Sequence, residues 1–161
     1  MRDTQNGRNS PSSRTKRTTL PTEMNAYSFA DAVACLRNAG VAVTRPRIEI
    51  ARIMFSRPVH LTAEQVFERV RTASPETSRA TVYNTLNFFS EKKLVRKLLV
   101  TPQHVIFDST PTPHFHLFDA DTGEISDLDP QDLKVVGQPK LPEGVELEEV
   151  DVIVRVRSRK S

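Results

Sequence analysis

The fold is decided by the stretch Thr77-Ser-Arg-Ala-Thr-Val-Tyr-Asn-Thr-Leu-Asn-Phe-Phe89. At 3.6 residues per turn, Val82, Leu86 and Phe89 share one side of a helix, which suits packing against a core. Side chains that can hydrogen-bond base edges or phosphates project from another side: Arg79, Thr81, Tyr83, Asn84 and Asn87. The pattern predicts an amphipathic helix with one face suited to DNA. An ordinary surface helix would have a similar composition.

Three more helices are expected before this one, each begun by a polar capping residue or by a proline suited to a first turn. Thr62 and Gln65 have the spacing of a capping box, in which two polar side chains satisfy backbone N–H groups at a helix start. The expected helices span about 28–39, 44–55 and 62–74, and the fourth runs to about Glu91.

Strands are expected after the helices. Residues 94–100 and 104–108 flank Thr101-Pro-Gln103, which is typical of a hairpin with a short loop. Arg96 and Lys97 make the first of these strands basic. Helices followed by a two-stranded hairpin form the winged-helix plan, which places one helix in the major groove and the hairpin beside the DNA backbone.

The second half has a different pattern. Residues 114–119 and 124–128 bracket Asp121-Thr-Gly123 and predict a second hairpin, followed by a proline-containing connection over 130–142, with room for a short helix. Residues 145–157 alternate and predict a strand with one apolar face: Val150, Val152, Val154 and Val156. So small a half buries little apolar surface by itself, so we expect a homodimer.

The predicted fold class is α+β, with an N-terminal winged-helix DNA-binding domain followed by a small α/β dimerisation domain. The first domain is expected over 26–108 and the second, which would also sense a ligand, over 109–161. Residues 1–25 are basic and rich in Ser, Thr and Asn without periodicity, so we expect a leader without fixed structure. That leader would attract DNA non-specifically or serve only as a solvated tail.

Charge is unevenly distributed along the chain. Residues 1–100 have 17 Lys and Arg against 8 Asp and Glu, a net charge of +9, whereas residues 101–161 have 6 against 12, a net charge of −6. The basic half can neutralise phosphates and gain affinity by releasing counterions. The acidic half offers oxygen ligands or a partner surface, unless the segregation has no functional meaning.

Composition excludes several classes of protein. The chain has no apolar run of about 18 residues, so no membrane span is expected. The basic N-terminus lacks the apolar segment of a secretory signal, so a cytoplasmic location is expected. A single cysteine, Cys35, excludes an intrachain disulfide and any Cys-x-x-Cys zinc site. We expect Cys35 to be a small buried core residue.

The histidines suggest a metal site. His114 and His116 are two residues apart on a predicted strand, so their imidazoles share a face. Asp108 and Asp127 end the neighbouring strands, and His/Asp sets suit iron, zinc or manganese. A solvated strand edge would give the same pattern. Asp119 and Asp121 are expected to shape a turn rather than to bind metal.

Nothing in the chain predicts an enzyme. It has no glycine-rich phosphate loop and no nucleophile elbow. A His/Asp metal cluster could activate water for hydrolysis, but a hydrolase would leave the polar helix face and the charge split unexplained.

Together these residues resemble the ferric uptake regulator family, whose members are dimeric winged-helix regulators that respond to metal. The resemblance covers about 29–157 and rests on His60-Leu-Thr-Ala-Glu-Gln-Val66, on Ser78-Arg-Ala-Thr-Val-Tyr-Asn-Thr-Leu-Asn87 and on the two later histidines. Asn84, where typical members have arginine, and residues 150–157 are most similar to the iron response regulator branch. Proteins of that branch control iron and haem metabolism genes and can sense haem.

The resemblance implies roles for individual positions. Tyr83 would contact bases, with Arg79 and Asn84 nearby, and the phosphate contacts would come from Arg45, Arg47, Arg96 and Lys97. A metal site joining the two domains would use His60, Asp108, His116 and Asp127. His114 would lie beside that site or act as a haem ligand. The function expected is thus a dimeric, sequence-specific transcription regulator on a palindromic operator, responding to iron, another divalent metal or haem.

Some positions depart from the family pattern. Asp119-Ala-Asp-Thr122 stands where the structural-zinc Cys-x-x-Cys is expected, so no four-cysteine zinc site can form. Phe115 interrupts the usual three-histidine run, and Cys35 is followed by Leu36 rather than by the proline of a Cys-Pro haem motif. A metal-independent winged-helix module therefore stays open as an alternative.

Overall fold

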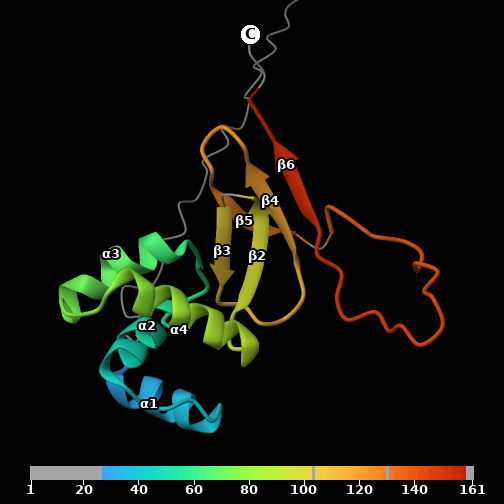
Figure 1. Cartoon of the computed structure of the whole chain (residues 1–161). Helices are drawn as coiled ribbons and strands as arrows, with labels where there is room; N and C mark the ends of the chain where they lie inside the picture. The colour runs from blue at the N-terminus through green and yellow to red at the C-terminus, as the bar shows by residue number, and fades with distance from the viewer. Residues whose placement is uncertain (1–26, 103, 130, 159–161) are drawn as a thin grey trace, which may run out of the picture.

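The computed structural model describes residues 27–102, 104–129 and 131–158, so the predicted leader lies outside the described residues. The order of the elements is the predicted one (Figure 1), with one additional short strand, β1. The helices are α1 (Phe29–Asn38), α2 (Arg45–Phe55), α3 (Ala63–Ala73) and α4 (Arg79–Glu91), and the strands are β1 (His60–Leu61), β2 (Arg96–Thr101), β3 (His104–Asp108), β4 (Phe115–Asp119), β5 (Ile125–Leu128) and β6 (Ile153–Val156).

Helix starts follow the capping signals of the sequence. The Ser28 side chain accepts from the Asp31 N–H, and the Thr62 side chain accepts from the Gln65 N–H, each within a full capping box. Ser78 caps α4 by accepting from the N–H of Thr81. These bonds satisfy N–H groups that have no partner within the helix, so the helix starts could be predicted from the local sequence.

The helices enclose the main hydrophobic core. Val82, Leu86 and Phe89 of α4 are fully buried, as the helical spacing predicted. They pack with residues from α1, α2, α3 and the wing, as the β2–β3 hairpin is called below: Leu36, Ile50, Met54, Val66, Val70 and Phe107. The polar face of α4 is thereby left on the outside of the helical layer.

The strands form two sheets of three. The first has the order β1-β3-β2 and the second the order β5-β4-β6, in which β6 runs parallel to β4. The strand β1 was not predicted, because two residues are too short for a periodic signal. In the first sheet Asp108 pairs in register with both His60 on β1 and Arg96 on β2. Register partners in antiparallel strands point to the same face of a sheet, so these three side chains form one row.

A second apolar cluster joins the two sheets. Leu98, Val100 and Ile106 of the wing are buried against Phe118 of β4. Ile125 and Ile153 are partly buried beside them. This cluster is small compared with the main core, so polar contacts have a large part in fixing how the two sheets meet.

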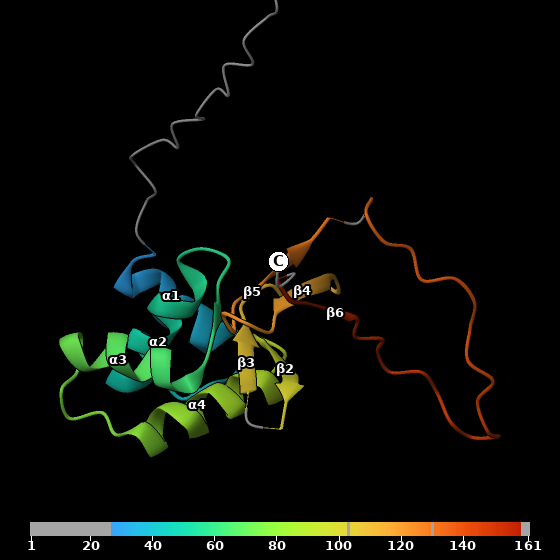
Figure 2. The ribbon, with the colours of Figure 1, turned by 90° about the horizontal axis from the view of Figure 1, so that it is seen from above.

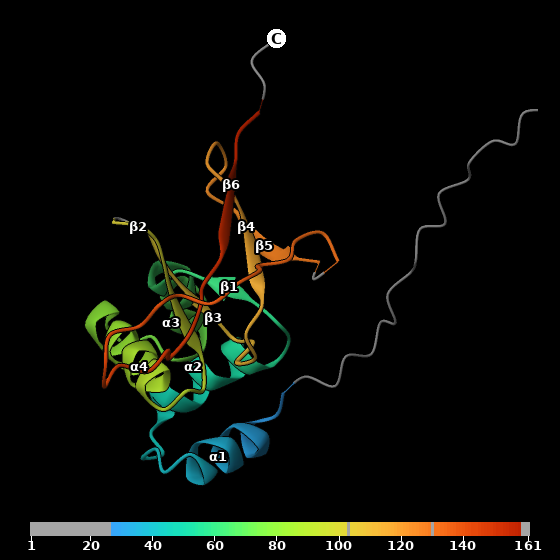
Figure 3. The same ribbon diagram turned by 90° about the vertical axis from the view of Figure 1, so that its right-hand side faces the viewer.

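The C-terminal segment differs from the prediction. The strand expected over 145–157 is limited to Ile153–Val156, and no helix forms within residues 131–142. Residues 131–152 instead form a long loop that extends outward on the side of β6 (Figures 1 and 2). Ile153, not the row of valines, packs on the inter-sheet cluster, while Val150 and Val156 are exposed. Figure 3 shows β6 continuing away from the helices. No helix in the described ranges combines the length and apolar character needed to span a membrane.

Candidate metal centre and nucleic-acid face

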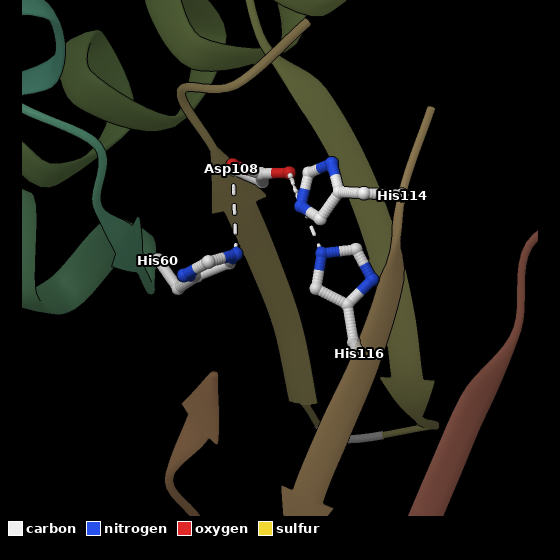
Figure 4. Close-up of side chains that lie close together, drawn as sticks. All are labelled: His60, Asp108, His114 and His116. Atoms are coloured by element: carbon white, nitrogen blue, oxygen red, sulfur yellow. Dashed lines mark ion pairs between the residues drawn. The ribbon is translucent and has the colours of Figure 1, made fainter. Parts of the chain in front are cut away.

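Four side chains from both halves of the chain converge at one point (Figure 4). They are His60 of β1, Asp108 at the end of β3, His114 just before β4 and His116 of β4, and they are called the metal cluster below. One potential ligand atom of each lies within 4.8 Å of the others. A single divalent ion with bonds of about 2.0–2.2 Å requires ligand atoms this close together.

Asp108 lies at the centre of the cluster. Its Oδ1 is 3.5 Å from His60 Nε2, and its Oδ2 is 3.2 Å from His114 Nε2 and 3.5 Å from His116 Nε2. The backbone N–H of Thr110 donates to Oδ1 at 2.8 Å and orients the carboxylate. The end of β3 thus presents a fixed anionic ligand to three imidazoles.

Asp127 closes the open side of the cluster. It lies on β5 as the register partner of His116, and its Oδ1 is 3.0 Å from the Nε2 atoms of both His60 and His114. Its side chain is 49% exposed, whereas those of Asp108 and His116 are fully buried. The structure therefore brings all five sequence-predicted metal residues together, with Asp127 on the solvent side.

Several cluster atoms are buried without a hydrogen-bond partner among the described residues: His60 Nε2, Asp108 Oδ2, His114 Nε2, and both ring nitrogens of His116. Leaving a buried polar atom unsatisfied costs about 1–3 kcal/mol, so such a group of atoms needs a ligand. His114 Nδ1 is 2.8 Å from the Thr112 carbonyl oxygen, to which it donates as N–H. That tautomer leaves the Nε2 lone pair free, as a metal ligand requires. The donor set fits a divalent transition metal.

Burial and charge prepare the cluster for a cation. Burial lowers the pKa of His60 below its ordinary value of 6.5, although the charges of Asp108 and Asp127 oppose this. For Asp108, burial raises the pKa. The nearby His116, the Thr110 N–H and the charges of His60 and His114 outweigh that effect, so the pKa is lowered overall. A neutral His60 and an ionised Asp108 are the forms that bind metal.

The outer face of α4 carries exposed polar side chains. Tyr83 is 44% exposed, and Asn84 is exposed beside it. Lys97 Nζ on the wing donates to Asn87 Oδ1 at 2.8 Å and lies 5.8 Å from the centre of the Tyr83 ring. These contacts join α4 and the wing into one surface, with Thr81 half-buried near the start of the helix.

The predicted arginines have different environments. Arg79 is exposed and makes a bidentate ion pair with Glu64 of α3, with its guanidinium over the Phe67 ring. Arg45 donates to the Ala73 carbonyl, and Arg47 donates to the Ala42 carbonyl. Sequence reasoning missed Glu64 as the partner of Arg79, because contacts between helices leave no local signal.

Arg96 contradicts its predicted role as a phosphate contact. Its side chain is 9% exposed, and its Nη2 donates to Glu149 and Asp151 in the loop before β6. Lys97, the next residue on β2, points to the opposite face and is exposed. Strand alternation was the signal, since Arg96 shares its face with the buried Leu98 and Val100.

The turn at Asp119 and the burial of Cys35 were also predicted from the sequence. Asp119 Oδ1 accepts from the N–H groups of Asp121 and Thr122, so it shapes a turn as expected. Cys35 was predicted to be buried, but it is only partly buried. Ala32 and Leu36 are the fully buried residues of α1, and Cys35 lies at the edge of the face that they form.

Comparison with known proteins agrees with this geometry. The model of the ferric uptake regulator family matches residues 38–155. The chain belongs to this family. The chain is 30% identical over 102 residues to the peroxide-responsive repressor PerR of Staphylococcus aureus, covering 63% of this chain and 69% of that protein.

Solved structures of ferric uptake regulators have the same fold. The protein of Pseudomonas aeruginosa, determined with manganese, aligns with a TM-score of 0.60 and 25% identity over 80% of this chain and 98% of that one. That of Francisella tularensis, determined with iron, aligns with a TM-score of 0.59 and 21% identity over 74% and 93%. This ferric uptake regulator family member thus has an N-terminal winged-helix DNA-binding domain and a C-terminal dimerisation domain. Its family consists of metal-responsive transcription regulators rather than enzymes.

Proposed function

We propose that this protein is a homodimeric repressor whose binding to a palindromic operator is controlled by a divalent metal at His60, Asp108, His114, His116 and Asp127. The observation that carries the proposal is the buried metal cluster, which combines ligands from both halves. His60 precedes α3, and α3 packs on α4, so ligation acts on the element that supports the DNA-facing helix. Fixing the angle between halves would set the spacing of two α4 helices on neighbouring half-sites.

The DNA-facing surface assigned here is α4 with the exposed side of the wing. Tyr83 and Asn84 would contact base edges, while Arg45, Arg47 and Lys97 would contact phosphates. Arg79 can join them when it leaves Glu64. The domain division at about residue 108 follows from this assignment, because β3 ends at Asp108 and the second sheet begins with β4.

The dimer surface would lie on the second sheet and its loop. Val150 is 45% exposed and Val156 is 36% exposed. Val154 and Val156 alternate with Ile153, which packs on the inter-sheet cluster, so these two valines lie on the other side of β6, while Val150 lies in the loop before the strand. A second copy covering this face would bury apolar surface that a half of this size cannot cover alone.

We also propose that the protein is similar to the iron response regulator branch. Asn84 on the exposed side of α4 and the absence of cysteines at Asp119 and Thr122 support this assignment. In the haem alternative, His114 would have to leave Asp108, Asp127 and the Thr112 carbonyl to reach an iron porphyrin. Iron, manganese or zinc in the cluster requires no such rearrangement.

The decisive experiment measures metal content and operator affinity together. Purified protein is titrated with a labelled operator after chelation, and again with manganese, zinc, ferrous iron, haem or peroxide-treated iron. We expect metal to change the affinity and His116→Ala to remove that response. Equal affinity of chelated and metal-loaded protein would leave a metal-independent DNA-binding module. A Soret band with altered DNA affinity would favour haem, and turnover without DNA binding would indicate a hydrolase.

A further inference from the structure

Arg96 has acidic partners that lie outside the metal cluster. It belongs to the row His60–Asp108–Arg96 across the first sheet, so it lies on the face that meets the second sheet. Within this row, His60 and Asp108 belong to the metal cluster. Arg96, at the other end of the row, reaches the acidic segment that leads into β6, with Nη2 2.5 Å from Glu149 Oε1 and also bonded to Asp151 Oδ1.

Charged residues of both signs lie around Arg96. A cleft of about 550 Å³ lies between the wing and residues 148–151. Residues of both signs line it, with Lys93, Arg96 and Lys97 on one side and Glu148, Glu149 and Asp151 on the other, although the Lys97 side chain points to the opposite face of β2. Arg96 Nε and Nη1 are buried without a partner in the described part of the chain. A buried guanidinium with only one of its nitrogens paired depends strongly on the two carboxylates that it does reach.

A second arginine crosses the same boundary from the opposite direction. Arg155 of β6 donates through Nη2 to the Val100 carbonyl of β2, and its guanidinium lies 5.8 Å from the Phe118 ring centre. β2 and β6 belong to different sheets, so these arginine contacts connect the sheets directly. Besides the metal cluster and the apolar cluster around Phe118, the two sheets are therefore also attached through Arg155 and through Arg96 and the loop before β6.

We propose that Arg96, Glu149 and Asp151 form a metal-independent ion-pair latch that positions β6 on the wing and sets the resting orientation of the two halves. None of these three residues belongs to the metal cluster, so the latch persists when the cluster holds no metal. Metal binding then acts on halves that the latch and the apolar cluster around Phe118 already join. The latch limits how far they move and how strongly DNA affinity responds. Arg96 is thus a positioning residue rather than a DNA contact.

The test uses the full-length protein with Glu149→Gln and Asp151→Asn combined, because both side chains are about half exposed and their loss leaves the core intact. Arg96→Gln is the companion variant. Glu143→Gln combined with Glu146→Gln is the matched control, since it removes two charges from the same exposed loop without touching Arg96. Hydrogen exchange over 146–156 is measured with and without manganese, together with manganese affinity and operator affinity.

For chelated protein we expect the latch variants to exchange at least about tenfold faster over 146–156 than wild type, and the control to match wild type. Raising salt should accelerate exchange in wild type but not in the latch variants, because screening weakens the same ion pairs. Manganese affinity should stay within about twofold. The ratio of operator affinities with and without metal should change by about threefold or more, a typical effect of residues that couple two sites.

Exchange that is the same in latch variants and control would overturn the latch. The measurement of operator affinity rests on the proposed function, whereas the measurement of hydrogen exchange does not. If no form of the protein bound DNA, the proposed function would fail while hydrogen exchange still decided the latch. A response to metal that is unchanged in the latch variants, despite faster exchange, would overturn the claim that the latch sets the DNA response.

Discussion

The Nε2 atom of His60 lies 3.5 Å from Oδ1 of Asp108, and the two residues are register partners in the β1–β3 pair. The two-residue strand β1 thus has a purpose beyond pairing, because it holds an imidazole at a fixed position beside the carboxylate. Its other residue, Leu61, is buried in the helical core just ahead of α3. A metal bound between the halves would therefore act on a segment that is directly joined to the helical layer.

Replacing Asp108 with Asn should abolish tight metal binding while keeping the fold. The change preserves shape but removes the only fully buried carboxylate of the cluster, and an amide is a poor ligand for these metals. Loss of an outer-shell partner alone costs roughly 10–100-fold in metal affinity, so loss of this ligand should cost more. At a metal concentration of 100 times Kd, the wild-type protein should gain about 2.7 kcal/mol of stability. Thermal unfolding with and without manganese or zinc measures this gain.

A gain in the Asn variant equal to that of the wild type would remove Asp108 from the ligand set. Asp129→Asn serves as the control, because Asp129 is exposed and lies outside the metal cluster.

The stability of the metal-free protein should fall as the pH drops below about 6.5. Burial lowers the pKa of His60 in the folded protein, so the unfolded chain takes up a proton at a higher pH than the folded one. The stability that the neutral imidazole contributes is therefore present above the unfolded pKa of about 6.5 and is lost as the pH falls toward the folded value. Melting temperatures of chelated protein between about pH 7.5 and about pH 5.5 measure this loss. His60→Gln cannot titrate and should show a shallower slope; identical slopes would contradict the assignment.

Glu64→Gln should strengthen DNA binding. Glu64 holds the exposed Arg79 through bonds of 2.9 and 2.7 Å, and Arg79 must leave this pair before it can reach a phosphate or a base. Removing the negative charge frees the guanidinium and also reduces repulsion of the DNA backbone. The gain should be roughly twofold to fivefold, the scale of one exposed ion pair. Fluorescence anisotropy with labelled operator measures it. Glu143→Gln removes the same charge from a distant loop and should have no such effect, and equal effects of the two changes would show that only net charge matters.

Local signals made the helical layer predictable. Capping residues such as Ser28 and Thr62 act over a few positions, so their outcome was fixed without knowledge of the rest of the fold. Part of the metal cluster was predictable for a related reason, because the spacing of His114 and His116 on an expected strand places their rings on one side. His60 could be added to this pair only through the family resemblance.

The elements that were not predicted correctly depend on contacts between residues far apart in the sequence. β1 exists only because β3 offers it an edge, and the extent of β6 depends on β4 rather than on the alternation of residues 145–157. The error over Arg96 has a different origin. Two neighbouring basic residues on one strand cannot both face DNA, and the buried Leu98 on the side of Arg96 showed which of the two turns inward.

Tyr83 should contribute to sequence-specific binding more than to general attraction. It is exposed on α4, next to Lys97 of the wing, where a base-reading side chain of a winged helix is expected. Tyr83→Ala should weaken binding to the operator by roughly tenfold or more, matching the scale of about 1–3 kcal/mol for one recognised base pair. Affinity for unrelated DNA should change much less, because phosphate contacts supply that term. Lys97→Gln is the counterpart and should weaken binding to both DNAs and reduce the salt dependence by about one ion. If Tyr83→Ala weakened both DNAs equally, Tyr83 would be a backbone contact, and base reading would have to be assigned to Asn84 or Arg79.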